Sequence, residues 1–233
     1  MDIKIIASGS SGNATLISDS KTSLLLDAGL AIKELQEGTD FRLSNVSDCL
    51  ITHDHGDHSK AVKDLVKRGL DVYASKGTLD KLSANGHRYH ALTALEDLTI
   101  GTFKVMPFDV LHDAAEPLGF LVESTVTGEK LIYFSDTAYV KYTFQGLTHI
   151  IAECNHGEQE LRQSVMSGVI NPELAKRIAK NHMSLERLID FFKANDLSRL
   201  KEVYLVHLSD NNSNEHRFKQ AIQRVTGTEV YVH

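Results

Sequence analysis

Three histidines and one aspartate of the stretch LITHDHGDH are candidate metal ligands. They are His53, His55, Asp57 and His58, and the apolar run before them predicts a buried strand. Gly56 would let the backbone turn, so a tight loop is expected at the carboxyl end of that strand. The two histidines of HDH, still partly extended, would point to the same side and bind one ion. The residues after the bend would serve a second ion. A metal site explains this stretch better than a histidine-rich surface loop does.

Residues of the same types follow other predicted strands. They are Asp27 at the end of LLLD, His112 after residues 103–111, Asp136 after LIYFS, and His207 after residues 203–206. Loops at one edge of a sheet are where α/β proteins assemble their sites. Each residue alone would be unremarkable, but together they complete a metal-site pattern. The carboxylate of Asp27 is expected to hold a neighbouring loop through hydrogen bonds.

The hydrophobic pattern predicts an α/β chain. Short strands are expected at residues 3–7, 15–18, 23–27, 49–51, 71–74, 98–100, 103–108, 120–124, 131–134, 149–153, 203–206 and 229–232. Helices are expected after a cap at Ser59, over 76–85, after Asn171 and Pro172, after Ser184, and around 218–225. SGSSGN would be a hairpin loop in preference to an anion-binding loop. No repeat or linker interrupts the chain, so one domain over residues 1–233 is expected.

Composition restricts the class of protein. With 233 residues and 42% hydrophobic residues, the chain can bury a sizeable core. The formal net charge of −6 counts weakly against a nucleic-acid partner, although two divalent cations beside two carboxylates would still attract a phosphate locally. Only Cys49 and Cys154 are present, which argues against a disulfide scaffold and fits a reducing compartment. The start MDIKIIAS has no leader pattern and no later run suits a membrane span, so a cytoplasmic protein without a membrane partner is expected.

HDHGDH, followed in order by His112, Asp136 and His207, resembles the metallo-β-lactamase fold superfamily over essentially the whole chain. The segments SGSSGN, SDTAYV, ECNH, NHMS and VHLSDNN resemble its single-domain, nuclease-like YycJ/WalJ branch. The resemblance implies an α/β fold of the four-layer αβ/βα sandwich type. The chain has no room for the inserted cap domain of the β-CASP nucleases, so the resemblance to those stops at the metal site.

The resemblance also implies roles for individual residues. The first metal ion would be held by His53, His55 and His112, and the second by Asp57, His58 and His207, with Asp136 bridging the two. Asp57 would also be catalytic, and Asp27 matches the early structural aspartate of the family. His182, in NHMS, lies where tRNA-processing members carry an extra catalytic histidine. The spacing alone fits a surface residue near a helix cap as well as it fits a site residue at His182.

These residues predict hydrolytic chemistry. Imidazole and carboxylate ligands without thiolate favour Zn²⁺ and also suit Mn²⁺ or Fe²⁺. Two ions about 3.5–4 Å apart would lower the pKa of a shared water to about 7, and the resulting bridging hydroxide would be the nucleophile. His182 would then protonate the leaving group as general acid. Glu153 is expected to support the ligands. Substrate contacts are expected from Ser209, Asn211, Asn212 and His156, although the residues after His207 would equally form only a turn.

The favoured function is a metal-dependent phosphodiesterase, specifically a nuclease with DNA favoured over RNA. The alternative on the same fold is a hydrolase of a small cyclic phosphodiester, lactone or thioester, which the acidic net charge mildly favours. A noncatalytic binding scaffold is a third reading, and the full ligand set argues against it. The sequence leaves the physiological metal, the strand polarity and the oligomeric state open.

Overall fold

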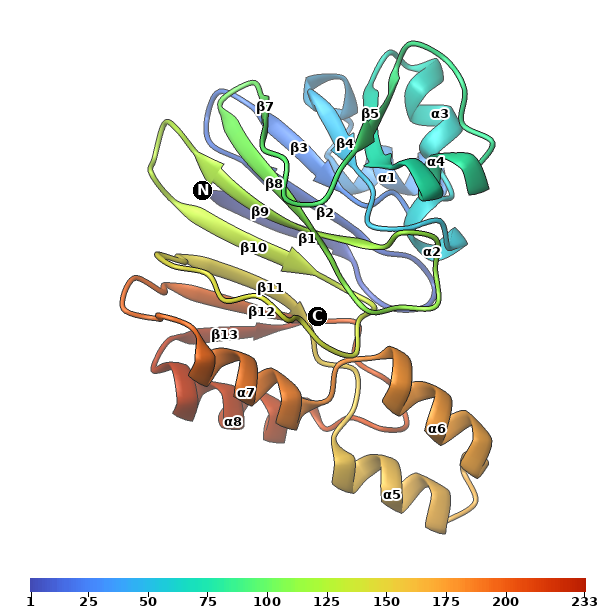
Figure 1. The fold of residues 1–233 in the computed structure, drawn as a ribbon, viewed down its shortest axis with the longest axis vertical. Coiled ribbons are helices and arrows are strands. Elements are labelled where there is room, and N and C mark those ends of the chain that lie inside the picture. The colour runs from blue at the N-terminus through green and yellow to red at the C-terminus, as the bar shows by residue number, and fades with distance from the viewer. The chain divides into compact units, whose positions relative to one another are not determined.

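The computed structural model describes residues 1–233. The chain divides into two compact units. Unit 1 comprises Met1–Asp109 with Ala114–Glu129, and unit 2 comprises Val110–Asp113 with Lys130–His233. Both units combine strands with helices, which confirms the predicted α/β class (Figure 1). The single domain over residues 1–233 stays a prediction.

Unit 1 contains a sheet of six strands in the order β1-β2-β3-β4-β5-β6. They are β1 (Asp2–Ala7), β2 (Ala14–Ser18), β3 (Ser23–Leu26), β4 (Asp48–Leu50), β5 (Asp71–Ser75) and β6 (Tyr89–Leu92). The first three pair antiparallel, and β3 to β6 run parallel. SGSSGN is therefore a hairpin loop between β1 and β2, as predicted. An antiparallel set, β7 (Leu98–Ile100), β8 (Phe103–Asp109) and β9 (Leu118–Ser124), completes the strands of this unit.

The helices of unit 1 pack on its six-stranded sheet. They are α1 (Ile32–Gly38), the 3₁₀ helix η1 (Leu43–Asn45), α2 (Gly56–Ser59), α3 (Val62–Lys67) and α4 (Lys76–Lys81). Leu35 of α1 and Leu65 of α3 join one buried cluster with Leu25, Cys49 and Val72 from three neighbouring strands. Burial of this apolar surface holds β4, and with it the start of the histidine loop, in place.

Several local predictions in unit 1 are wrong. Ser59 does not cap a helix, because its hydroxyl donates back to the carbonyls of Asp54 and His55 while α3 begins three residues later. Gly56 does not make a left-handed turn; it is the first residue of the short helix α2. The helix predicted over 76–85 ends at Lys81, since Ser83 has a positive φ of 50°. The strand β6 was not predicted.

Unit 2 contains four parallel strands in the order β10-β11-β12-β13. They are β10 (Lys130–Phe134), β11 (His149–Glu153), β12 (Glu202–Val206) and β13 (Glu229–Val232). Phe134 pairs with Ala152, and Glu153 pairs with Val206. The carboxyl ends of β10, β11 and β12 therefore lie at one edge, which brings together the side chains that follow these strands.

The helices of unit 2 are α5 (Glu158–Met166), α6 (Pro172–Asn181), α7 (Leu185–Ala194) and α8 (Glu215–Thr226). Figure 1 shows α7 and α8 side by side along the strands, with α5 and α6 forming a separate pair beyond the strand ends. The predicted caps are confirmed, because Asn171 accepts from the amide of Leu174 and Ser184 accepts from the amide of Arg187. The amide of His182 donates to the carbonyl of Ile178 at the end of α6, so this bond and the cap at Ser184 fix the backbone on both sides of His182.

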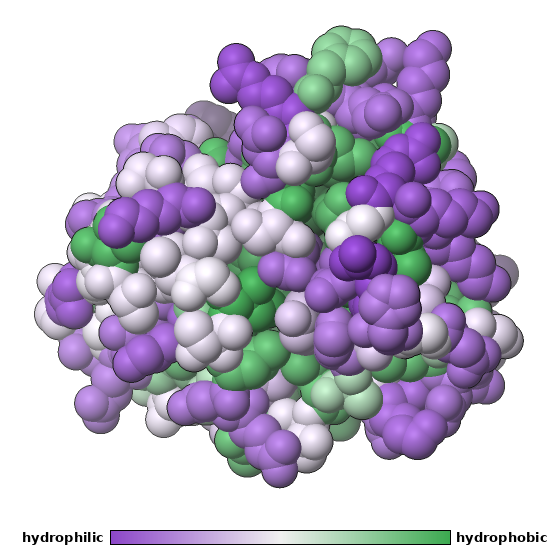
Figure 2. Space-filling model, turned by 90° about the horizontal axis from the view of Figure 1, so that it is seen from above, coloured by the Kyte–Doolittle hydropathy of each residue, from purple (hydrophilic) through white to green (hydrophobic).

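The surface carries no broad apolar area on the face drawn in Figure 2, where small hydrophobic groups are interspersed among hydrophilic residues. None of the helices combines the length and apolar character needed to cross a bilayer.

Candidate metal centre

In unit 1 the histidine loop places its ring nitrogens at ligand-like separations. The Nε2 atom of His53 lies 3.1 Å from Nδ1 of His55. Two nitrogen ligands of one tetrahedral ion, each with a bond of about 2.0–2.1 Å, would lie about 3.3 Å apart. A carboxylate oxygen of Asp57 lies 3.6 Å from Nε2 of His58. The loop therefore presents two pairs of donor atoms.

Asp27, just after β3, fixes the orientation of this loop. Its carboxylate accepts from the backbone amide of Thr52 at 2.8 Å and from the Thr52 hydroxyl at 2.9 Å. The other oxygen lies 2.8 Å from Nδ1 of His58. A carboxylate on one imidazole nitrogen leaves the opposite nitrogen as the acceptor that a metal ion requires. Asp27 thus sets the tautomer of His58 with its proton on Nδ1.

Asn13, which sequence reasoning passed over, ties the SGSSGN hairpin to the same loop. Its backbone amide donates to the carbonyl of Asp57 at 2.7 Å. Its side-chain amide nitrogen lies 3.0 Å from Nε2 of His58 and donates to the carbonyl of Gly9 at 3.0 Å. The only feature of the sequence that could have pointed to this contact is the asparagine at the end of the Gly- and Ser-rich turn.

In unit 2 the predicted ligands His112, Asp136 and His207 meet. Nε2 of His112 lies 3.8 Å from one oxygen of Asp136, and Nδ1 of His207 lies 3.3 Å from the other. The backbone carbonyl of Asn181 lies 3.3 Å from Nδ1 of His112. The three residues lie in different loops, which follow β8, β10 and β12. The fold therefore brings them together, because they are far apart in the sequence.

Glu153, at the end of β11, organises a second group in unit 2. Its Oε1 lies 2.6 Å from Nδ1 of His182 and 3.2 Å from Nδ1 of His207. Its Oε2 accepts from the amides of Thr137 and Met183 at 2.9 and 3.0 Å. Asp136, Glu153, His182 and His207 each offer a donor atom within 4.8 Å of the others. The imidazole of His182 is thus held by a fully buried carboxylate.

The electrostatics of this group follow from burial and charge. Burial alone would lower the pKa of His182, but the charge of Glu153 and its hydrogen bond raise that pKa above the ordinary value. Burial alone would raise the pKa of Glu153. The charge of His182 and the hydrogen bonds from His182 and His207 outweigh burial, so the pKa of Glu153 is lowered. Burial lowers the pKa of His112. The Glu153–His182 pair therefore favours an ionised carboxylate beside a protonated imidazole.

Three of these residues adopt a backbone conformation that is unusual for side chains other than glycine. Asp27, Asp136 and His207 have φ values of 61°, 48° and 56°. Each follows a parallel strand, where the left-handed conformation turns the chain sharply at the edge of the sheet. Such strained positions cluster at functional sites. The same geometry at three strand ends agrees with the predicted importance of these residues.

The predicted substrate contacts lie in or near a turn. The side-chain amide of Asn212 donates to the hydroxyl of Ser209 at 2.9 Å, and the carbonyl of Asn211 accepts from Ser164 at 2.6 Å. The segment after His207 thus forms the turn that the sequence left as an alternative. The fourth residue, His156, is buried, and burial lowers the pKa of its imidazole to about 4.

The donor atoms in each unit fit divalent metal ions. They are imidazole nitrogens and carboxylate oxygens, which suit Zn²⁺, Mn²⁺ and Fe²⁺. Neither Cys49 nor Cys154 belongs to a group of side chains close enough together to hold a metal ion. The chemistry of the His and Asp clusters therefore suggests divalent metal ions.

Comparison with known proteins agrees with this chemistry. A family model described as a beta-lactamase superfamily domain matches residues 22–208. The chain is 30% identical to the exodeoxyribonuclease YycJ of Bacillus anthracis, over 92% of this chain and 85% of that protein. It is also 30% identical to the exodeoxyribonuclease WalJ of Streptococcus pneumoniae, over 90% and 82% of the two chains.

Among solved structures, the metallo-beta-lactamase fold protein YhfI from Bacillus subtilis matches with a TM-score of 0.76 at 17% identity, covering 99% of this chain and 95% of that chain. The fold extends over the same residues that carry the predicted ligands. This chain belongs to the metallo-β-lactamase fold superfamily, in the branch of YycJ and WalJ.

Proposed function

We propose that this protein is a metal-dependent nuclease that hydrolyses phosphodiester bonds of DNA, with DNA favoured over RNA. The observation that carries the proposal is the 30% identity to an exodeoxyribonuclease over 92% of the chain, in a chain that retains every ligand-type residue expected of the family. The complete set of ligand-type residues argues against a noncatalytic scaffold.

We assign His53, His55 and His112 to one ion. Asp57, His58 and His207 are assigned to the other, and Asp136 to both. The 3.1 Å separation of the His53 and His55 nitrogens supports the first assignment. The two carboxylate oxygens of Asp136, one facing His112 and the other facing His207, support its bridging role. Zn²⁺ is favoured, with Mn²⁺ and Fe²⁺ as the other candidates.

Two divalent ions held by these residues supply an activated water and positive charge for the transition state of phosphodiester hydrolysis. We assign Asp57 a catalytic role as well as a ligand role because of its position on the HDHGDH loop. Asp27 and Glu153 keep the imidazoles of His58 and His207 in their orientations through bonds of 2.8 and 3.2 Å. The protein therefore holds these two imidazoles in fixed orientations for metal binding.

His182 is assigned as general acid for the leaving oxygen. Glu153 holds its Nδ1 atom, so the transferable proton resides on Nε2. A general acid contributes roughly 100- to 10,000-fold in rate. Ser209, Asn211, Asn212 and His156 remain proposed substrate contacts, and for Asn212 the buried and unpartnered Oδ1 supports the assignment. A single domain and a cytoplasmic location complete the proposal.

The test is a substrate panel assayed with Zn²⁺, Mn²⁺ and Fe²⁺ in turn. The panel holds end-labelled single-stranded DNA, duplex DNA, RNA of the same sequence, and a cyclic dinucleotide. The proposal predicts metal-dependent cleavage of a DNA substrate, with slower cleavage of RNA. Hydrolysis of the cyclic dinucleotide alone would replace the nuclease with the small-substrate hydrolase.

A further inference from the structure

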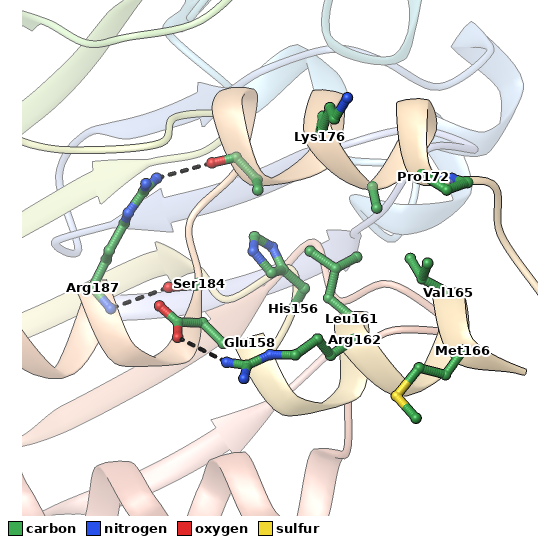
Figure 3. Close-up of a pocket in the computed structure, with 12 residues that line it drawn as sticks. His156, Glu158, Leu161, Arg162, Val165, Met166, Pro172, Lys176, Ser184 and Arg187 are labelled. Atoms are coloured by element: carbon green, nitrogen blue, oxygen red, sulfur yellow. Dashed lines mark hydrogen bonds and ion pairs between the residues drawn. The ribbon is translucent and has the colours of Figure 1, made fainter.

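Unit 2 contains a pocket of about 520 Å³ that none of the assigned metal ligands lines. It lies between α5, α6 and the start of α7, and its lining includes His156, Leu161, Val165, Met166, Arg187 and Ala175. Figure 3 shows the imidazole of His156 in the space between the two helices, with Arg187 on one side and Leu161 on the other. The volume is within the range of roughly 300–1,000 Å³ that is typical of small-molecule sites.

The wall formed by α5 is apolar but accessible. Leu161 lies at its buried end, and Met166 lies at its outer end with 85% of its surface exposed. Methionine is flexible and polarizable, so it packs readily against flat, irregular ligands. On the opposite wall, Pro172 and Ala175 leave the space open because their side chains are short. The pocket can therefore cover the faces of a flat apolar group.

His156 supplies a polar group at the base of this space. The residue is 2% exposed, and its buried Nδ1 atom has no hydrogen-bond partner. Its carbonyl accepts from the amide of Leu185 at 2.8 Å, and its backbone bridges to Ser184, so its backbone is fixed beside the start of α7. A buried polar atom without a partner costs stability, so a native structure that keeps one needs an explanation. A ligand whose entry opens access to Nδ1 supplies that partner.

The rim of the pocket carries one positive charge without an acidic partner. Of the three cations that line it, Arg162 pairs with Glu158 at 3.7 Å and Lys176 pairs with Glu173 at 2.9 Å. Arg187 forms no ion pair; its guanidinium donates to the backbone carbonyls of Ala138 and Ala179 at 3.1 and 3.0 Å. Its charge is therefore not cancelled by an acidic partner, and the rim favours an anionic group beside the apolar space.

We infer that this pocket binds a nucleobase of the DNA strand, with His156 bonded to the edge of the base and Arg187 near its phosphate. The inference rests on the proposed nuclease function. A nucleotide joins the three features that the pocket matches: flat apolar faces, in-plane donors and acceptors, and an attached anion. A neutral imidazole carries one donor and one acceptor, which suits the mixed edge of a base.

The pocket is adjacent to the group that holds the proposed general acid. Ser184, which lines the pocket, is two residues beyond His182, and His156 is three residues beyond Glu153. Glu153 and His182 lie close enough to His156 to influence its ionisation. The bound base would therefore belong to a nucleotide next to the cleaved bond, and it would position the strand for cleavage.

The test combines a variant of the protein with a variant of the substrate. Single-stranded oligodeoxynucleotides are prepared with an abasic residue at each of the positions flanking the cleaved bond, and KM and kcat are measured for wild type and His156→Leu. We expect one abasic position to raise the wild-type KM by roughly five- to tenfold, the equivalent of one hydrogen bond and its packing. In His156→Leu that penalty should fall to about twofold, because the hydrogen bond is lost and only the packing of the base remains.

Met166→Glu provides a second variant that leaves the core intact, with Gln163→Glu as its matched control on the same helix outside the pocket lining. Met166→Glu should raise KM severalfold, and Gln163→Glu should have less effect. Equal losses on normal and abasic substrates in His156→Leu would overturn base binding.

A binding measurement separates this inference from the proposed function. Oligonucleotides with 2-aminopurine at each position are titrated with the protein without added metal, so no cleavage is required. A fluorescence change at one position that His156→Leu abolishes supports the pocket even if no DNA is cleaved, and in that case the nuclease proposal alone fails. Cleavage by wild type without any position-specific change leaves the nuclease and overturns the pocket.

Discussion

The Nδ1 atom of His182 lies 2.6 Å from Oε1 of Glu153, and Glu153 is fully buried. Two backbone amides on the other oxygen, from Thr137 and Met183, keep this carboxylate in place. The imidazole of His182 therefore has one nitrogen committed to the protein, and its half-buried position leaves the ring able to meet a substrate. This relationship favours His182 as a proton donor over His182 as a metal ligand.

Replacing His182 with Ala should lower kcat for DNA cleavage by roughly 100- to 10,000-fold. Bound metal, measured by elemental analysis, should stay nearly unchanged, because His182 holds no ion in this assignment. His87→Ala, at an exposed position outside the site, is the matched control and should keep full activity. Loss of metal from His182→Ala would make that residue a ligand.

Replacing Asp27 with Asn should lower metal affinity by roughly 10- to 100-fold. If the amide oxygen accepts from Thr52, its nitrogen must donate to Nδ1 of His58, and the proton of that imidazole then moves to Nε2. A protonated Nε2 cannot bind metal. Competition with a chromophoric chelator gives the affinity, and Asp64→Asn, a change at a partly exposed position on α3, should leave it unchanged. Equal affinities for all three proteins would exclude the tautomer argument.

Gly29 should be less tolerant of substitution than Gly56, although only Gly56 belongs to the HDHGDH motif. A Cβ atom at Gly29 would lie 1.6 Å from the carbonyl oxygen of Asp57, whereas one at Gly56 would meet nothing within 4 Å. Gly29→Ala should therefore cost about 1–3 kcal/mol or more of unfolding free energy and weaken metal binding. Gly56→Ala should preserve both. Urea unfolding and metal titration of the two variants check this, and a fully stable Gly29→Ala protein would contradict the close approach.

Asp19 should stabilise unit 1 in a pH-dependent manner. Burial raises the pKa of its carboxyl, but hydrogen bonds from Ser124, Thr102 and two backbone amides outweigh burial and lower that pKa below 3.8. A lowered folded-state pKa gives stability that is present above the unfolded pKa and is lost as pH falls through the folded one. Asp19→Asn should therefore lose about 1–3 kcal/mol near neutral pH, and the loss should shrink below about pH 3.8.

Asp97→Asn, an exposed change in the same unit, is the control for Asp19→Asn and should follow wild type at every pH. Urea unfolding from pH 2.5 to 7.5 provides the comparison. A constant difference between Asp19→Asn and wild type across that range would show that the hydrogen bonds do not depend on ionisation.

Sequence reasoning located the strand ends well, because apolar runs and the polar residues that stop them are local signals. Asp136 and His207 were predicted from their place just after β10 and β12, and the parallel register then brings them together. The caps Asn171 and Ser184 were likewise predictable from residue type. The resemblance, and not periodicity, singled out His182.

Features that depend on tertiary contacts were not predictable. The contact of Asn13 with His58 joins residues 45 positions apart, and nothing in the hairpin sequence marks its partner. The loop expected around Gly56 became the helix α2, because the carbonyl of His55 accepts from the amides of His58 and Ser59. The pocket beside His156 needs α5 and α6 to pack as a pair, which hydrophobic patterning alone did not indicate.

Titration of the metal-free protein with Zn²⁺ or Mn²⁺, with cleavage of end-labelled single-stranded DNA as the readout, is the most direct test of a two-ion nuclease. We expect no cleavage without metal, and a rise in cleavage that reaches its plateau at two equivalents of bound ion per chain. Cleavage that persists in the metal-free protein, or a plateau at one equivalent, would contradict it.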